Sequence, residues 1–156
     1  VEIKRLLDAG VQSFVIPFIQ DRSEAEAAIA ATRYPPEGVR GVAGGRGSRF
    51  GHIENYFANA HKEICVILQV ETAEAVDQIE EIAGVKGVDA IFVGPADLAA
   101  SMGHLGNFDH PDVQAKIKEA AKRIKKAGKP SGILSFVGSD QGLLVSSMKA
   151  LNAKFR

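Results

Sequence analysis

The sequence predicts an α/β fold with a largely parallel sheet. Short apolar runs of strand length alternate along the chain with amphipathic stretches of helix length, which is typical of repeated βα units. The apolar runs have no polar face, as expected for strands that are covered on both sides. Several of the helix-length stretches end at a glycine. With 156 residues, the chain is long enough to bury a substantial core, and we predict one domain over residues 1–156.

The first third of the chain is expected to hold one strand between two helices. Residues 2–9 place three aliphatic side chains on one helical face and stop at a glycine. Residues 13–19, SFVIPFI, have the composition of a buried strand, and the alanine-rich residues 23–33 favour a helix. A turn follows at residues 34–38, because proline fixes its own φ and disfavours helix in the residue before it. Residues 41–51 contain five glycines and are expected to form a flexible loop.

Clearer βα units follow the glycine-rich loop. Residues 52–62 are expected to form a short helix. Residues 64–70 are apolar on both faces and predict a strand, and residues 72–83 predict the helix that follows it. Residues 90–93 predict the next strand, which leads into the segment Gly94-Pro95-Ala96-Asp97-Leu98.

The last third predicts a long helix, a strand and a terminal helix. Residues 111–127 carry apolar side chains at helical spacing, with lysine and arginine on the opposite face. Residues 131–137 predict a strand and residues 141–155 a helix. The total is four or five strands, whereas a complete (β/α)8 barrel has eight and typically about 250 residues. The residue pattern leaves two fold classes open, a smaller open α/β sheet and an incomplete barrel.

Composition excludes several function classes. Lysine plus arginine and aspartate plus glutamate both number 19, so the charge balance favours neither nucleic acid nor an anionic membrane as a partner. No apolar run approaches the roughly 20 residues that span a bilayer. The single cysteine, Cys65, lies inside an apolar strand and is interpreted as a core residue. We therefore expect a soluble, cytoplasmic protein.

Two carboxylates mark the chemistry that we expect. Glu71 stands at the carboxyl end of one predicted strand, and Asp97 follows the end of the next strand, 26 residues later. Neighbouring parallel strands lie about 4.8 Å apart, so both side chains could meet at one edge of the sheet. Two anions at that distance repel unless a proton or a cation lies between them. A divalent cation such as Mg²⁺ or Mn²⁺ would resolve the conflict and keep coordination positions open for substrate.

Plainer interpretations stay open. Glu71 could simply favour the start of the next helix, and Asp97 could cap a turn. Gln69 points to the same face as Glu71 and could bind a ligand or line the barrel. Residues 44–49, GGRGSR, could form a mobile active-site loop or a plain surface loop. The four histidines lack paired metal-binding spacing, and we interpret each as a cap, turn or surface residue.

The sequence resembles the HpcH/HpaI aldolase family, most closely its 2-dehydro-3-deoxyglucarate aldolase branch. Three motifs that occur together carry the resemblance: RYPPEGVRG at residues 33–41, QVET at residues 69–72 and VGPADLA at residues 93–99. LLDAG, GHLGN, KPSGIL and VGSD extend it over nearly the whole chain. The resemblance implies a (β/α)8 TIM barrel of the phosphoenolpyruvate/pyruvate type, incomplete in this chain.

The resemblance also implies an activity and a set of roles. The family's class II aldolases use a divalent metal ion, Mg²⁺ most often and Mn²⁺ or Co²⁺ in some cases. They cleave 2-oxo-3-deoxy sugar acids into pyruvate and an aldehyde acid such as tartronate semialdehyde. By motif position Glu71 and Asp97 are metal ligands, and Gln69, Ala96 and Asp97 contact substrate. Asp8 matches the acid that raises the basicity of a catalytic histidine.

The chain also departs from the family pattern. The family's catalytic histidine and its transition-state-stabilising arginine belong to strands that would precede Val1. A helix-sized segment is expected between the KPSGIL and VGSD motifs and is absent. Two alternatives to the sugar-acid aldolase are therefore kept: a 4-hydroxy-2-oxoheptanedioate aldolase, and a noncatalytic fragment that binds metal and 2-oxo acid. Family members resemble hexamers, so we expect a homo-oligomer whose partners are a small 2-oxo acid and an aldehyde, without nucleic acid or membrane.

Overall fold

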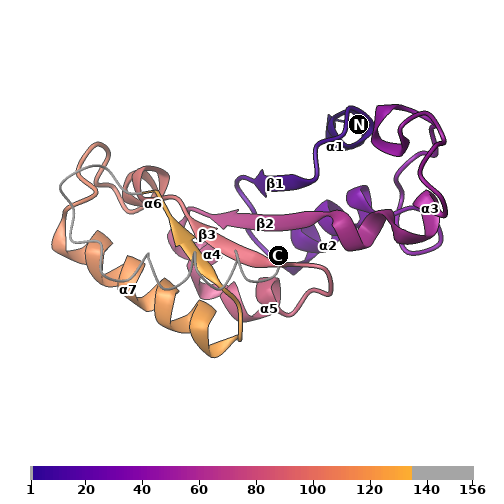
Figure 1. Cartoon of the computed structure of the whole chain (residues 1–156). Coiled ribbons are helices and arrows are strands. Elements are labelled where there is room, and N and C mark those ends of the chain that lie inside the picture. Colours follow the sequence, from indigo (N-terminus) through magenta and orange to yellow (C-terminus); the bar gives the residue numbers. More distant parts are fainter. Residues whose placement is uncertain (1, 135–156) are drawn as a thin grey trace.

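The computed structural model of the protein describes residues 2–134, which form four parallel strands joined by helices (Figure 1). The strands are β1 (Ser13–Ile16), β2 (Cys65–Val70), β3 (Ala90–Val93) and β4 (Ser131–Ile133). The α-helices are α1 (Glu2–Asp8), α2 (Arg22–Thr32), α3 (Tyr56–Asn59), α4 (Ala73–Asp77), α5 (Ile79–Ala83), α6 (Pro95–Ser101) and α7 (Pro111–Lys126). Two 3-10 helices, η1 (Arg46–Ser48) and η2 (Ala60–Glu63), lie between β1 and β2.

The strands follow one another in the sheet in chain order, β1-β2-β3-β4. Every neighbouring pair is parallel, and the register aligns Ile16 with Leu68 and Val70 with Val93. All four carboxyl ends therefore meet at one edge. Strand order that never reverses is typical of a barrel arc, because a doubly wound open sheet reverses its order at a switch point.

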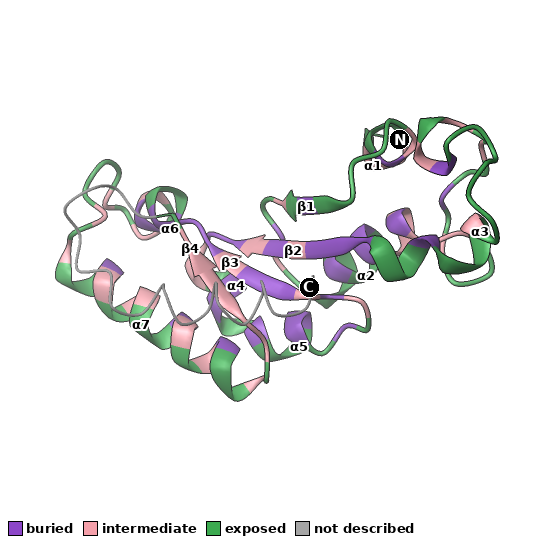
Figure 2. Ribbon diagram, viewed as in Figure 1, coloured by how far each residue is buried: buried purple, intermediate pink, exposed green. Residues whose placement is uncertain are grey.

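Helices cover one face of this sheet. Helices α2, α5 and α7 contact one another in turn, and α7 packs on β3 and β4 (Figure 1). Side chains that face these helices are fully buried, among them Val66, Leu68 and Ile91, whereas Val15 on the other face of β1 is 50% exposed. Figure 2 shows β1 mostly exposed and β2 mostly buried. The expectation of a buried strand at residues 13–19 is thus wrong for β1, in which Ser13 and Val15 are exposed.

Local signals set the helix ends. The Asp21 side chain accepts a hydrogen bond from Glu24 N at 2.9 Å and caps α2, and Thr72 caps α4 through Ala75 N at 3.1 Å. These contacts satisfy amide groups that a helix leaves free at its first turn. Helix α7 begins at Pro111, whose missing N–H costs nothing in the first turn.

Some expected boundaries are wrong. The strand expected at residues 13–19 ends at Ile16, because Pro17 has no donor and Phe18 has a φ of 59°. The helix expected at residues 52–62 begins only at Tyr56, after Asn55 with a φ of 52°, and ends as a 3-10 helix. The helix expected at residues 72–83 is two short helices that meet at Gln78.

The other expectations differ less from the structure. Helices α1, α2 and α7 lie within one residue of their expected bounds, and β3 matches its expected range. Strand β4 ends at Ile133, and the helix expected at residues 141–155 lies outside the described residues. Among residues 2–134, no helix combines the length and apolar character needed to cross a membrane.

Candidate metal centre

Two acidic side chains lie at the carboxyl edge of the sheet. Glu71 directly follows β2, and Asp97 lies in the first turn of α6, which begins two residues after β3 ends. Glu71 is 4% exposed, whereas Asp97 is exposed to solvent. The structure thus brings together the two carboxylates whose spacing predicted a shared site.

Hydrogen bonds hold both oxygens of the Glu71 carboxylate. Phe18 N donates to Glu71 Oε1 at 2.9 Å, and Gln69 Nε2 donates to Oε2 in a short contact. The segment after β1 is fixed to the end of β2 by two further bonds, from Ile19 N to Gln69 O at 3.0 Å and from Thr72 Oγ1 to Gln20 Oε1 at 2.7 Å. The orientation of Glu71 is therefore set by two neighbouring strands together.

Opposing effects act on the Glu71 carboxyl. Burial is the largest and raises its pKa, the hydrogen bond from Gln69 lowers it, and the nearby Asp97 carboxylate raises it again. The net direction is upward from the ordinary value of 4.5. A carboxylate buried beside a second carboxylate is stabilised by a proton or by a cation, and a cation does so without neutralising either ligand.

Gly94 leaves the space that this carboxylate occupies. A Cβ built on Gly94 would lie 2.5 Å from Glu71 Oε2 and 2.8 Å from Gln69 Nε2. Both distances are shorter than real Cβ contacts, which essentially never fall below 3.0 Å. A side chain at this position would displace Glu71 or Gln69 from the arrangement seen here, whereas the φ of −92° is one that other residues adopt freely.

The donor set fits a hard divalent cation. Glu71 and Asp97 supply carboxylate oxygens, which Mg²⁺ and Mn²⁺ prefer over nitrogen or sulfur. Asp97 is exposed, so solvent can reach the side of the pair that faces away from the core. Ala96 precedes Asp97 in the same helical turn and is also exposed. An ion held here would keep positions open for water or a small oxo acid.

Asp8 lies elsewhere. It ends α1, which lies beyond the amino-terminal ends of the strands (Figure 1). Its carboxylate accepts hydrogen bonds from Lys4 and, at 2.9 Å, from Arg40 Nη2. Burial raises the pKa of Asp8, but the two cations outweigh it and the net direction is downward. Within residues 2–134 the structure shows no contact between Asp8 and the carboxylate pair, and its catalytic role stays a prediction.

The glycine-rich loop also lies away from the carboxylate pair. Its 3-10 turn packs on α1, and Arg46 and Arg49 line a pocket of about 470 Å³ with Leu7 and Tyr56. The structure therefore places this loop beside α1 and α3. The expectation of a mobile active-site loop is not tested by this position.

Sequence reasoning missed three features of the structure. The Phe18 amide has no signal in the sequence, since any residue carries an N–H. Gly94 precedes a proline in the VGPADLA motif, but its role depends on a contact with Glu71 that the sequence does not show. His104 and His110 were each interpreted as a cap, turn or surface residue, and His110 does cap α7, but nothing in the sequence indicates that the two rings stack.

Comparisons with known proteins agree with this fold. The family model HpcH/HpaI aldolase/citrate lyase matches residues 1–149. A hydroxypyruvate/pyruvate aldolase of Sagittula stellata is 54% identical over 151 residues, which are 96% of this chain and 58% of that protein. A 5-keto-4-deoxy-D-glucarate aldolase of Escherichia coli is 52% identical over 141 residues, covering 90% of this chain and 55% of the relative.

Solved structures extend the comparison to the fold. The crystal structure of an HpcH/HpaI aldolase/citrate lyase family protein from Burkholderia cenocepacia superposes with a TM-score of 0.82 at 41% identity. The match covers 97% of this chain and 59% of that one. An HpcH/HpaI aldolase from Desulfitobacterium hafniense gives a TM-score of 0.78 at 27% identity, covering 98% of this chain and 65% of the other.

These matches settle the fold class. The strand order, the single helical layer and the superpositions identify the described sheet as part of a (β/α)8 barrel. The chain spans between 55% and 58% of the length of the Escherichia coli and Sagittula stellata relatives. It belongs to the HpcH/HpaI aldolase/citrate lyase family.

Proposed function

We propose that the chain is part of a metal-dependent class II aldolase that cleaves 2-oxo-3-deoxy sugar acids, such as 2-dehydro-3-deoxyglucarate, to pyruvate and tartronate semialdehyde. The observation that carries the proposal is the buried Glu71 carboxylate, held by Gln69 and the Phe18 amide beside Asp97. The names of the relatives, which include pyruvate aldolases and 5-keto-4-deoxy-D-glucarate aldolases, support the same reaction class.

In this proposal Glu71 and Asp97 hold the divalent ion, with Mg²⁺ the first choice. The bound ion would neutralise the negative charge that develops on the 2-oxo acid as the C3–C4 bond breaks. Gln69 fixes the rotamer of Glu71 through its short hydrogen bond and, with Ala96 and Asp97, contacts the substrate. Cleavage also requires a base that takes the C4 hydroxyl proton. That Asp8 raises the basicity of this base is proposed from the family resemblance alone, since α1 lies at the opposite end of the strands from Glu71 and Asp97.

Two alternatives are distinguished by substrate and by turnover. A 4-hydroxy-2-oxoheptanedioate aldolase would use the same two ligands and differ in the aldehyde that it releases. A noncatalytic fragment would bind metal and pyruvate without releasing product. The sugar-acid reaction is preferred because the Escherichia coli relative that bears this name is 52% identical.

Calorimetry with Mg²⁺ and Mn²⁺ tests the metal site first. The parent chain is expected to bind one ion, and Asp97→Ala is expected to weaken binding by at least about tenfold. Asp109→Ala is the matched control, because Asp109 is also an exposed aspartate after β3 and forms no ion pair with the other described residues. Equal binding by the parent and by Asp97→Ala would refute the assignment.

Pyruvate release then separates the alternatives. Lactate dehydrogenase with NADH reports pyruvate from 2-dehydro-3-deoxyglucarate or from 4-hydroxy-2-oxoheptanedioate as a loss of absorbance. Faster release from the first substrate supports the proposal, and faster release from the second supports the alternative aldolase. Metal binding without release from either supports the noncatalytic fragment. We also propose a cytoplasmic homo-oligomer, and sedimentation equilibrium would measure its size.

A further inference from the structure

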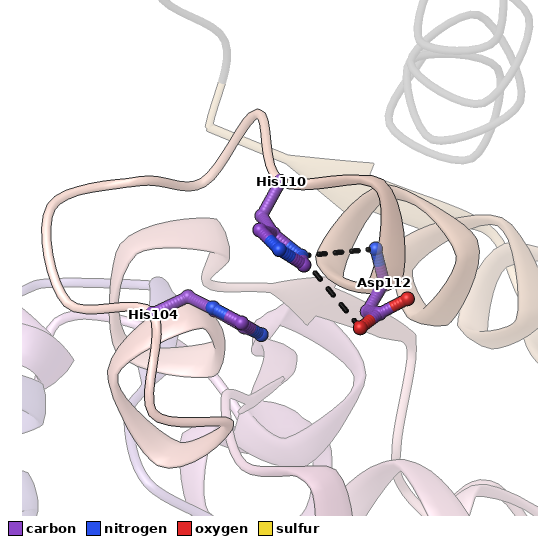
Figure 3. Close-up of side chains that lie close together, drawn as sticks. All are labelled: His104, His110 and Asp112. Carbon is purple, nitrogen blue, oxygen red and sulfur yellow. Dashed lines mark hydrogen bonds and ion pairs between the residues drawn. The ribbon is translucent and has the colours of Figure 1, made fainter.

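The connection between α6 and α7 brings two histidines face to face. The rings of His104 and His110 stack with centroids 3.6 Å apart and an interplanar angle of 15° (Figure 3). Gly103 and Gly106 have φ values of +80° and +78°, which allow the connection to fold back on itself. His104 N donates to Ala99 O at 2.7 Å, which anchors that side of the pair to α6.

A carboxylate completes the cluster. Asp112 lies in the first turn of α7, and its Oδ2 is 3.7 Å from His110 Nδ1 (Figure 3). One ligand atom from each of the three side chains lies within 4.8 Å of the others. We propose that His104, His110 and Asp112 form a second cation site, which takes a borderline transition-metal ion such as Zn²⁺ and is separate from the Glu71–Asp97 pair.

Binding requires the two rings to tilt out of their stack, because an ion lies in the plane of each imidazole that binds it and the two stacked planes, 15° apart, run nearly parallel. A small contraction is needed as well. Ligands at about 2.0–2.2 Å from one ion lie at most roughly 4.4 Å from each other, so a 4.8 Å separation must close slightly. The Asp112 side chain is 72% exposed and His110 is 32% exposed, so rotation meets little packing resistance. His110 Nδ1 accepts a hydrogen bond from Asp112 N at 3.3 Å. An ion on Nδ1 would replace this weak hydrogen bond, whereas an ion on Nε2 would leave the hydrogen bond to Nδ1 intact.

The ligand types select the ion. Imidazole nitrogen suits Zn²⁺, Cu²⁺ and Ni²⁺, whereas Mg²⁺ is bound almost entirely by oxygen. The positive end of the α7 dipole opposes a cation at this position, and the negative charge of Asp112 in the same turn offsets that effect. Two sites with different preferences would therefore lie on either side of α6, the carboxylate pair at its start and the His104–His110–Asp112 cluster beyond its end.

The proposed ion would tie α6 to α7. His104 follows α6 by three residues, and Asp112 belongs to α7. A bound ion would cross-link the connecting residues 102–110 and slow the hydrogen exchange of their amides. Because Asp97 begins α6, the same cross-link would also steady the helix that carries a proposed Mg²⁺ ligand.

Zinc calorimetry tests this proposal on the full chain without a polyhistidine tag. The protein is freed of metal with a chelator, saturated with Mg²⁺ to occupy the carboxylate pair, and titrated with Zn²⁺ at pH 7.5, where an ordinary imidazole is mostly neutral. One equivalent is expected to bind, and His104→Gln and Asp112→Asn are each expected to weaken binding by at least about tenfold. His52→Gln and His61→Gln are matched controls, since both are exposed and lie outside the cluster.

The spectrum of Cu²⁺ gives an independent readout, and its first measurement uses the parent chain alone. Electron paramagnetic resonance of the parent with one equivalent of Cu²⁺ is expected to show coupling to two imidazole nitrogens, and His104→Gln is expected to show one. Hydrogen exchange of residues 102–110 should slow when Zn²⁺ is added. The proposal is overturned if His104→Gln binds Zn²⁺ as the parent does, or if the parent spectrum lacks two nitrogens. It is also overturned if Asp97→Ala, and not His104→Gln, removes zinc binding.

Discussion

Gly94→Ala should displace the Glu71 carboxylate while leaving both carboxylates, Glu71 and Asp97, in the chain. The added Cβ would lie 2.5 Å from Glu71 Oε2, which is 0.9 Å inside the 3.4 Å at which ordinary contact begins. The backbone φ of −92° suits alanine, so the perturbation is steric and local. Metal–ligand distances tolerate only about 0.2 Å, and a carboxylate displaced by several times that amount is expected to lose divalent-ion affinity by at least about tenfold.

Overpacking should also lower the free energy of unfolding, by about 1–3 kcal/mol. Mg²⁺ calorimetry measures the affinity and urea denaturation measures the stability. Gly44→Ala is the matched control, because nothing lies within 4 Å of a Cβ there, and no change is expected. If Gly94→Ala bound Mg²⁺ as the parent does with unchanged stability, Glu71 could not be oriented as the structure shows and the metal assignment would fail.

Three further predictions concern single side chains. The pKa of Glu71 is raised in the folded protein, so the metal-free folded state keeps a proton that the unfolded chain releases. The free energy of unfolding that Glu71 contributes should therefore fall as pH rises from 4.5 through the raised pKa. Urea denaturation at a series of pH values measures this fall, and Glu71→Gln should flatten it. Cys65 is 2% exposed in β2 and is expected to have a structural role only. Cys65→Ala should lower the free energy of unfolding by roughly 1 kcal/mol in urea denaturation and leave the Mg²⁺ affinity unchanged. A changed Mg²⁺ affinity would contradict the structural role. Arg123 links α7 to Glu80 at 2.6 Å and to Asp77 O at 2.8 Å on the surface. Arg123→Ala should therefore lower the free energy of unfolding by about 0.5–1 kcal/mol at low salt and by less at 1 M NaCl. A loss that is independent of salt would contradict an ion-pair role.

Periodicity predicted the elements that depend on local signals. Helix α7 could be placed within one residue because Pro111 starts it, apolar side chains repeat at helical spacing, and Gly128 follows it with a φ of +75°. The helix expected at residues 52–62 was placed too early because Asn55 adopts a left-handed conformation, which asparagine tolerates better than most residues and which interrupts a helix. The end of β1 was placed too late although Pro17 has no donor, and the turn of the Phe18 amide toward Glu71 depends on a tertiary contact that the sequence does not show.

The candidate site could be predicted in part. Glu71 and Asp97 follow successive strands, and that spacing alone placed them at one edge of the sheet. The Phe18 amide could not be predicted, because it depends on the register between β1 and β2 and on a positive φ in a bulky residue. The His104–His110 stack depends on two glycines that bend the connection, so six residues of sequence separation gave no sign of contact.

The contacts of Glu71 couple metal binding to the docking of β1. Phe18 belongs to the segment after β1, and its N–H reaches Glu71 only when β1 is paired with β2 in the observed register. A bulky residue at a φ of 59° is strained by roughly 1 kcal/mol or more, and the hydrogen bond to a buried carboxylate compensates for that strain. An ion that stabilises the charged form of Glu71 strengthens this acceptor. Divalent ions should therefore stabilise the pairing of β1 with β2 as well as the site, because a ligand that binds only the ordered arrangement favours it by mass action.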